Sequence, residues 1–189
     1  MVNNINISEA LCSTRPIIDV RSPKEYQQGH IPNAINIPLF SDEERAEVGT
    51  TYKQVSKEAA IEQGTTLVNP KLLNFIHISK KAAPEGSAII HCWRGGMRSQ
   101  SFAKHLSDNG FSELSVITGG YKAYRNYVLD QLEVTIKIKL LGGFTGSGKT
   151  YILSELKKLG HQILDLEGLA HHKGSAFGGI GQDAQPTSE

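Results

Sequence analysis

The sequence predicts an α/β protein: a doubly wound parallel sheet, followed by the start of a second, P-loop NTPase-like α/β domain. Three observations predict this class. Short apolar strands alternate with helices over residues 1–133, which is the pattern of a parallel sheet covered on both faces. A glycine- and arginine-rich loop with a cysteine follows the strand at residues 87–90. A second glycine-rich loop, at residues 143–150, matches the P-loop pattern G-x-x-x-x-G-K-S/T.

The first predicted strand covers residues 17–20, where three of the four side chains are apolar. Ser22, Pro23 and Glu25 follow it and predict a helix that begins with a capping box. In such a box the serine and the glutamate each satisfy a backbone N–H group of the first turn, and proline suits the first helical position. Residues 35–37 predict the next strand.

An insertion with an acidic beginning occupies residues 41–62, and we expect it to be helical but broken near Gly49. Pro70 then opens a helix over residues 70–80, in which apolar side chains recur at helical spacing. Both segments precede the strand that carries the cysteine.

The remainder of the first domain alternates regularly between strands and helices. A strand is predicted over residues 87–90 and a helix from 99 to 109, ended by Gly110. Another strand over 114–117 and a helix over 121–132 complete the alternation. The first domain is therefore expected to span residues 1–133.

Residues 134–189 are expected to form the N-terminal part of a P-loop domain. An apolar strand over 134–141 leads into the glycine-rich loop, a helix over 150–159 follows, and a second strand is predicted over 163–167. A parallel sheet normally has more than two strands. We therefore expect this domain to be truncated.

Composition narrows the functional classes. Hydrophobic residues make up 39% of the chain, charged residues 21%, and the net charge is +1, as in ordinary globular proteins and without a global basic field. The N-terminus lacks a secretory signal, and no apolar run is long enough to span a membrane. Cys12 and Cys92 are not expected to form a disulfide. From these features we predict a cytoplasmic location. We expect neither a membrane partner nor a resident metal site.

The loop from Cys92 to Ser99, with the sequence CWRGGMRS, is the first candidate active site. Backbone N–H groups of such a loop can converge on one centre, and with Arg94 and Arg98 they favour a thiolate over a thiol. A thiolate of this kind attacks phosphorus, arsenic, sulfur or selenium. We assign catalytic roles to Cys92, Arg94 and Arg98, and ligand-binding roles to Trp93, Gly95 and Gly96.

The P-loop supplies the second group of binding residues. Its glycines allow the backbone to wrap around a phosphate, its lysine adds positive charge, and its threonine can reach Mg²⁺. Asp165, after an apolar run, is a candidate for the acidic residue that often accompanies such loops. The assigned residues are Gly143, Gly146, Ser147, Gly148, Lys149, Thr150 and Asp165. The ligand is a nucleotide or the diphosphate of another substrate.

Four separated motifs resemble the rhodanese domain family over roughly residues 12–130. They are IDVRS with Glu25-Tyr26, the segment GHIPNAINIP from Gly29, the Cys92 loop, and TGGY from Thr118. The resemblance implies a rhodanese-like sheet with Cys92 as the reactive group. The spacing C-x5-R is one residue longer than in sulfur-transferring members and also occurs in relatives that act as phosphatases or arsenate reductases.

A rhodanese domain followed directly by a P-loop resembles the tRNA 2-selenouridine synthase family. Further matching segments are SDEERAEVGT from Ser41 and DLEGLA from Asp165. The resemblance implies that sulfur of 2-thiouridine at the tRNA wobble position is geranylated from geranyl diphosphate and then replaced by selenium from selenophosphate. Cys92 would carry the selenium. The implied partners are that tRNA and an enzyme that supplies selenophosphate, and we expect a monomer.

Two other functional classes remain open at this level. One is a stand-alone rhodanese-type sulfurtransferase, or a C-x5-R phosphatase or arsenate reductase, centred on Cys92. The other is a P-loop kinase or nucleotide-binding module, centred on Lys149, with an inert rhodanese-like attachment. Phosphate release that depends on Cys92 would favour the first. Mg²⁺-dependent ATP binding that depends on Lys149 would favour the second.

Overall fold

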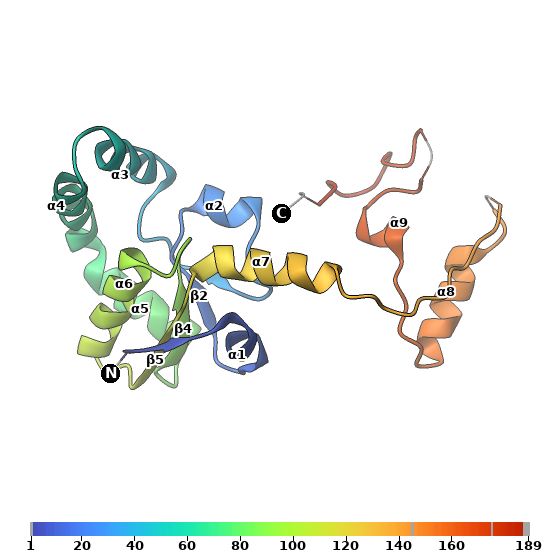
Figure 1. Cartoon of the computed structure of the whole chain (residues 1–189), viewed down its shortest axis with the longest axis horizontal. Helices are drawn as coiled ribbons and strands as arrows, with labels where there is room; N and C mark the ends of the chain where they lie inside the picture. Colours follow the sequence, from blue (N-terminus) through green and yellow to red (C-terminus); the bar gives the residue numbers. More distant parts are fainter. Residues whose placement is uncertain (1, 145, 175, 187–189) are drawn as a thin grey trace. The chain divides into compact units, whose positions relative to one another are not determined.

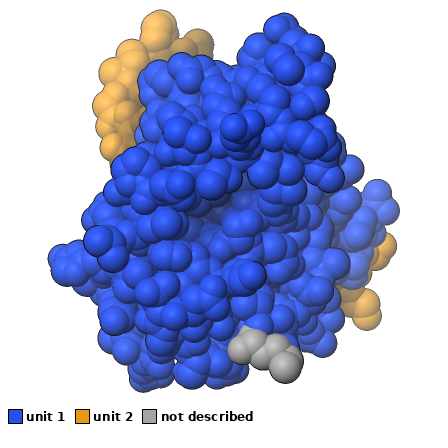
Figure 2. Space-filling view, turned by 90° about the vertical axis from the view of Figure 1, so that its left-hand side faces the viewer, with its two compact units in different colours: residues 1–134, 189 blue, residues 135–188 orange. Residues whose placement is uncertain are grey.

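A computed structural model describes residues 2–144, 146–174 and 176–186. The chain divides into two compact units, the first ending at Val134 and the second beginning at Thr135, which Figure 2 distinguishes by colour. We describe each unit by itself. None of the helices in the described ranges combines the length and the apolar character needed to span a lipid bilayer.

The first unit is built on a five-stranded sheet in which all strands are parallel. Its spatial order is β1-β5-β4-β2-β3, with β4 in the centre. The strands are β1 (Val2–Ile5), β2 (Ile17–Asp19), β3 (Ile35–Asn36), β4 (Ser87–His91) and β5 (Glu113–Ile117). The predicted α/β class with a parallel sheet is thus confirmed.

Helices cover both faces of this sheet (Figure 1). Ala88 and Ile90 of β4 point to one face, where they pack with Phe75 and Phe102, whereas Ile89 points to the other. The alternation follows from the two-residue period of a strand, and the continuous apolar run suits a strand buried on both faces. The helices of this unit are α1 (Ile7–Cys12), α2 (Pro23–Gln28), α3 (Asp42–Gln54), α4 (Lys57–Val68), η1 (Asn69–Lys71), α5 (Leu72–Ala82), α6 (Met97–Asp108) and α7 (Gly120–Leu132).

The capping box predicted at the start of α2 is confirmed. The Ser22 side chain accepts a hydrogen bond from the N–H group of Glu25, and the Glu25 carboxylate accepts one from the N–H group of Ser22. The box fixes the side chain of Glu25 at the end of β2. This position matters for the active-site loop described below.

The insertion differs from its prediction because α3 runs unbroken through Gly49. The two helices of the insertion are separated only at Val55 and Ser56, and Ser56 caps α4. Sequence reasoning also missed β1 and α1. The strand β1 contains two asparagines, and it is held by pairing with β5, more than 100 residues away in sequence.

In the second unit both predicted strands are wrong. Residues 135–144 form no regular element, and residues 161–165 lead into the short helix α9 (Leu166–Leu169). A strand needs hydrogen-bonding neighbours, and none pairs with either segment among the described residues. The predicted helix after the P-loop is confirmed as α8 (Lys149–Lys158).

Candidate active site

Cys92 lies between the end of β4 and the start of α6 and is buried, with 3% of its surface exposed. Its sulfur lies 3.3 Å from the hydroxyl oxygen of Ser99, in the first turn of α6. The Ser99 hydroxyl also contacts the carbonyl oxygen of Gly96, at 3.0 Å. The side chain of Ser99 thus joins the sulfur to the backbone of the same loop.

The start of α7 supports the loop from below. The N–H groups of Tyr121 and Lys122 donate to the carbonyl oxygens of Cys92 and Trp93, at 2.9 and 3.0 Å. Gly120 has a φ of +58° and lies so near that a Cβ atom on it would stand 2.2 Å from the Cys92 carbonyl oxygen. Gly95, with a φ of +64°, is equally confined by the carbonyl oxygen of Ile117. Only glycine fits both positions.

The environment of the sulfur favours a thiolate. Burial raises the pKa of Cys92, but the hydrogen bond with Ser99, the charge of Arg98 and the N–H groups of Arg94 and Ser99 together outweigh it. The pKa of Cys92 therefore lies below the usual value of a thiol. A larger thiolate fraction at neutral pH makes the sulfur a better nucleophile.

The two arginines of the loop have different surroundings. Arg98 donates to the Glu25 carboxylate at 3.1 Å, and Arg45 of α3 approaches the same carboxylate oxygen at 3.5 Å. Arg94 is exposed, and its guanidinium group has no partner among the described residues. An incoming anion would therefore meet Arg94 directly and would share Arg98 with Glu25.

A buried polar cluster lies beneath the loop. Asp19 and Arg21 form an ion pair at 2.7 Å with both side chains fully buried, and Nε2 of His91 lies 3.6 Å from the Asp19 carboxylate. The Arg21 guanidinium also stacks on the Tyr121 ring, at 3.8 Å from its centroid. Burial lowers the pKa of His91 more than Asp19 raises it, so His91 is neutral at pH 7. Trp93 packs on Tyr121, which ties the loop to this cluster.

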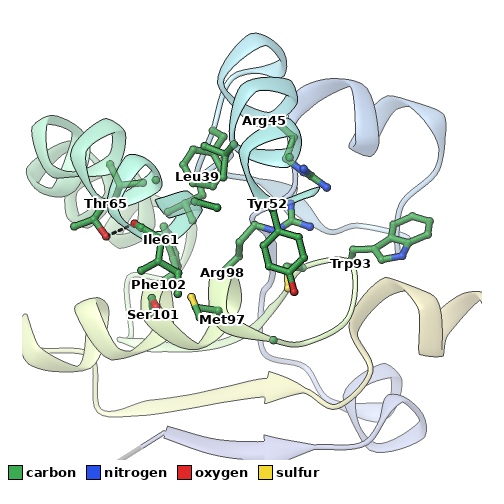
Figure 3. A pocket seen from close by; sticks show the side chains of 18 of the residues that line it. Leu39, Arg45, Tyr52, Ile61, Thr65, Trp93, Met97, Arg98, Ser101 and Phe102 are labelled. Atoms are coloured by element: carbon green, nitrogen blue, oxygen red, sulfur yellow. Dashed lines mark hydrogen bonds between the residues drawn. The ribbon is translucent and has the colours of Figure 1, made fainter. Parts of the chain in front are cut away.

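A pocket of about 860 Å³ opens above Cys92, between the loop, α6 and the helices of the insertion. Figure 3 shows Tyr52 of α3 and Ile61 of α4 extending toward α6, where Met97 and Phe102 lie. Figure 2, which views the first unit from the side of these helices, shows its surface hollowed there. The pocket is lined by Cys92, Trp93, Arg94, Gly96 and Arg98, so all the predicted loop residues except Gly95 border one space.

In the second unit the lysine of the P-loop contacts the beginning of the same loop. Nζ of Lys149 donates to the carbonyl oxygens of Gly143 and Phe144, at 2.9 and 2.8 Å. Gly146 and Gly148 have φ values of +80° and +82°, a left-handed backbone conformation that glycine adopts without steric cost. Ser147 and Thr150 lie beside them, at the beginning of α8.

Asp165 is found at a helix end, where the sequence predicted the end of a strand. Its carboxylate accepts a hydrogen bond from the N–H group of Gly168, at 3.1 Å, and so caps α9. Asp and Ser are favoured at this position because they satisfy otherwise free N–H groups. The prediction that Asp165 ends a strand is therefore wrong.

Sequence reasoning missed several residues that shape the Cys92 site. Ser99 and Gly120 lie inside motifs that were recognised, so a closer reading of those motifs would have singled them out. Glu25 was recognised as a capping residue and as part of a rhodanese motif, but its role beside Arg98 was missed, because this contact joins positions 73 apart. The helical insertion was predicted, but nothing in its sequence showed that α3 and α4 form a wall of the Cys92 pocket.

Comparison with known proteins agrees with this architecture. The rhodanese-like domain model matches residues 4–127, and the model of the tRNA 2-selenouridine synthase AAA domain matches residues 136–189. A solved structure, the N-terminal domain of a protein named for ATP/GTP binding from Clostridium difficile 630, is 42% identical with a TM-score of 0.62. It covers 67% of this chain, and 99% of its own length is matched.

The chain belongs to the rhodanese-like domain family, as its sequence predicts. The second matched model is described as the AAA domain of tRNA 2-selenouridine synthase, and proteins of that name are among the chains that this sequence resembles. The protein of that name from Serratia proteamaculans is 47% identical over 86% of this chain and 44% of its own length. The one from Proteus mirabilis is 43% identical over 97% of this chain and 51% of its own length. The chain spans about half the length of the curated relatives it matches.

Proposed function

We propose that this chain carries the selenium-transfer centre of a tRNA 2-selenouridine synthase, which replaces sulfur by selenium in 2-thiouridine at the tRNA wobble position. One observation supports this above all: the thiol of Cys92 has a lowered pKa and lies at the floor of a large pocket, within a loop that carries two arginines. Relatives that align with 87% and 86% of this chain bear the name of this activity.

Selenium in selenophosphate is at the selenide level, so the proposed loading step needs a two-electron acceptor, which we take to be a mixed disulfide between Cys92 and a small thiol. Water cleaves the selenium–phosphorus bond and releases phosphate and hydrogen selenide. The selenide then attacks the Cys92 sulfur, so that the sulfur–selenium bond forms as the disulfide bond breaks and the small thiol leaves. Arg94 and Arg98 bind the phosphoryl oxygens, because guanidinium groups match their geometry and charge. The N–H groups around Gly95 and Gly96 stabilise the negative charge that remains on selenium.

Selenium can replace sulfur at the base only if the sulfur becomes a good leaving group. We propose that the geranyl group of geranyl diphosphate is transferred to that sulfur first, with release of diphosphate. The selenium on Cys92 then attacks the same carbon of the base and the geranyl thiolate leaves. A small thiol finally attacks the Cys92 sulfur, which breaks the sulfur–selenium bond, leaves selenium on the base and restores the mixed disulfide. The P-loop, from Gly143 to Thr150, would bind the diphosphate or a nucleotide, with Thr150 available to Mg²⁺. Asp165 is kept as a binding candidate, although its carboxylate caps α9.

The tRNA is bound in this proposal through its phosphate backbone. Lysine and arginine side chains supply the sequence-independent part of such binding. Candidates are Lys122 and Arg125 of α7, with Lys137 and Lys139 after it. We place the reaction in the cytoplasm, with the protein as a monomer and selenophosphate supplied by a separate enzyme.

The test is a single-turnover reaction with an anticodon stem-loop RNA that contains S-geranyl-2-thiouridine. The chain is mixed with this RNA, selenophosphate, and reduced and oxidised glutathione, and the nucleosides are identified by mass spectrometry. We expect 2-selenouridine with the wild-type chain and none with Cys92→Ser. Equal conversion by Cys92→Ser would overturn the role of Cys92 as the selenium carrier.

A second candidate function is supported by the loop length alone. The C-x5-R spacing from Cys92 to Arg98 also suits a phosphatase or an arsenate reductase. Steady hydrolysis of p-nitrophenyl phosphate that is lost in Cys92→Ser, together with no 2-selenouridine, would favour this function. Sulfur transfer from thiosulfate to cyanide tests the sulfurtransferase alternative in the same variant pair.

The P-loop is tested with inorganic pyrophosphate, a probe shared by the nucleotide and the prenyl diphosphate alternatives. Lys149→Ala should weaken its binding about tenfold or more, because a charge-assisted contact to phosphate is lost. Lys158→Ala, at the far end of α8, is the matched control. Competition by ATP or by geranyl diphosphate then separates the two ligands.

A further inference from the structure

We propose that the pocket above Cys92 binds a ten-carbon isoprenoid chain, the S-geranyl group of the substrate base, and so places the carbon to be attacked beside the sulfur. The chemical class, a long apolar chain, follows from the walls of the pocket. Its identity as the geranyl group rests on the proposed function. Every residue that lines the pocket belongs to the first compact unit, whereas the P-loop belongs to the second.

The walls of the pocket are more apolar than selenophosphate requires. Leu39, Val48, Ile61, Val68, Leu72 and Phe102 line it, contributed by α3, α4, α5, α6 and the segment before α3. A small, strongly hydrated anion gains nothing from such walls, since burying charge without a partner is unfavourable. An alkyl or isoprenyl chain gains free energy with every methylene group that it buries there.

The volume of the pocket points in the same direction. About 860 Å³ is near the upper end of the range of sites for small organic ligands. A selenophosphate ion at the loop would leave most of this space unfilled. The pocket continues from Cys92 to the insertion helices, so a chain attached to a group at the sulfur would extend along the apolar walls.

The charges around the pocket suit a chain that is carried by RNA. Its charged lining residues are all basic: Arg45, Lys53, Lys57, Arg94 and Arg98. No carboxylate is among the described residues that line it, although Glu25 pairs with Arg45 and Arg98 from outside the lining. Phosphates next to the modified base would meet these side chains while the chain enters the apolar part. A free hydrocarbon would not use them.

Two large side chains at the pocket are more exposed than apolar groups usually are, and a bound apolar chain would cover them. Tyr52 and Met97 line the pocket and have 59% and 50% of their surface exposed. Figure 3 shows Tyr52 reaching from α3 over the space above the loop. Large apolar side chains at such a position gain contact when a chain is bound, and the thioether of methionine adapts to its shape.

The test measures how fast Cys92 adds to maleimides that differ only in their apolar tail. The sulfur forms a bond to a ring carbon, and the neighbouring carbon takes a proton from water, so no further reagent is needed. N-decylmaleimide is compared with N-methylmaleimide, and modification is read by peptide mass spectrometry. Cys12, which is exposed, gives the intrinsic rate ratio in the same molecule.

We expect the decyl-to-methyl rate ratio at Cys92 to exceed that at Cys12 about tenfold or more, since burial of only two methylene groups suffices for this factor. Ile61→Glu should bring the ratio at Cys92 close to that at Cys12, because it places a charge in the apolar wall. Val55→Glu is the matched control, since Val55 is 73% exposed and lies outside the pocket. Equal ratios at the two cysteines of the wild-type chain would overturn the proposal, whether or not Ile61→Glu folds.

Protection identifies the occupant. S-geranyl-2-thiouridine should slow the reaction of Cys92 with N-decylmaleimide, whereas S-methyl-2-thiouridine at the same concentration should not. A tail-dependent ratio without this protection would overturn the geranyl assignment. A chain that shows both effects but makes no 2-selenouridine would retain the pocket proposal and contradict the proposed function, so the two failures are distinguishable.

Discussion

Gly120 lies so close to the carbonyl oxygen of Cys92 that a Cβ atom on it would stand 2.2 Å away. The first residue of α7 is thereby part of the floor of the Cys92 loop. Its φ of +58° and the adjoining hydrogen bond from Tyr121 to Cys92 show how the loop is held from below.

We predict that Gly120→Ala displaces the loop and lowers the free energy of unfolding by about 2–4 kcal/mol, from the strain of a positive φ and from the close contact. Alkylation of Cys92 by iodoacetamide should slow about tenfold. Gly86→Ala is the control, because Gly86 also has a positive φ but its nearest new contact would be 3.7 Å away. It should cost about 1–2 kcal/mol and leave the thiol unchanged. Equal alkylation rates in the two variants would contradict the account.

Ser99→Ala should raise the pKa of Cys92, because the hydroxyl group 3.3 Å from the sulfur stabilises the thiolate. The pH midpoint of iodoacetamide alkylation would move upward. Because the folded wild type has the lower thiol pKa, this group adds stability above the unfolded pKa and loses it as pH falls through the folded pKa. Ser99→Ala should reduce that pH dependence. Ser101→Ala, on the same helix, should leave the midpoint unaltered; a matching shift there would argue against a specific hydrogen bond.

Glu25→Gln should strengthen anion binding at the loop. The carboxylate holds Arg98 and Arg45, and an incoming anion must compete with it for Arg98. We expect the affinity for sulfate to rise severalfold at low salt, because removing a nearby negative charge favours an anion. Titration calorimetry measures this change. Glu9→Gln, which alters the corresponding capping glutamate of α1, should have no effect. Unchanged sulfate affinity in Glu25→Gln would show that Arg98 does not meet the anion.

Asp19→Asn should destabilise the first unit by about 3–5 kcal/mol, because it leaves the fully buried Arg21 guanidinium without a counter-charge. Trp93, the only tryptophan, packs in this unit and reports its unfolding by fluorescence in urea. Glu113→Gln breaks the pair with Arg15 at a site where the glutamate side chain is 65% exposed, and should cost at most about 1 kcal/mol. Similar urea midpoints of unfolding for the two variants would contradict a larger contribution of the buried Asp19–Arg21 pair to stability.

The parts of the fold that sequence reasoning predicted are those fixed by local signals. The Ser22–Glu25 capping box, the apolar run of β4 and the loop of Cys92 each lie within a few residues. The contact between Arg98 and Glu25 and the pairing of β1 with β5 depend instead on the folded chain. The polar side chains of Asn3 and Asn4 interrupt the hydrophobic pattern by which a strand is recognised in a sequence. An edge strand such as β1 tolerates such side chains, so β1 was not predicted.

The second unit illustrates the opposite error. Ile136, Ile138 and Leu140 alternate as in a strand, yet each is at least 69% exposed and none lies in a sheet. These apolar side chains would be buried if the segment lay in a sheet between neighbouring strands. Among the described residues no strand pairs with it. Local periodicity therefore predicted an element that requires partners to form.

Intact-mass spectrometry after incubation with selenophosphate and oxidised glutathione tests the central claim most directly. The wild-type chain should gain one selenium atom that a thiol reductant removes, Cys92→Ser should gain none, and phosphate should appear in the ³¹P spectrum. Cys12→Ser should behave as wild type. A wild-type chain that gains no selenium although its Cys92 reacts with iodoacetamide would contradict the role of Cys92 as the selenium carrier.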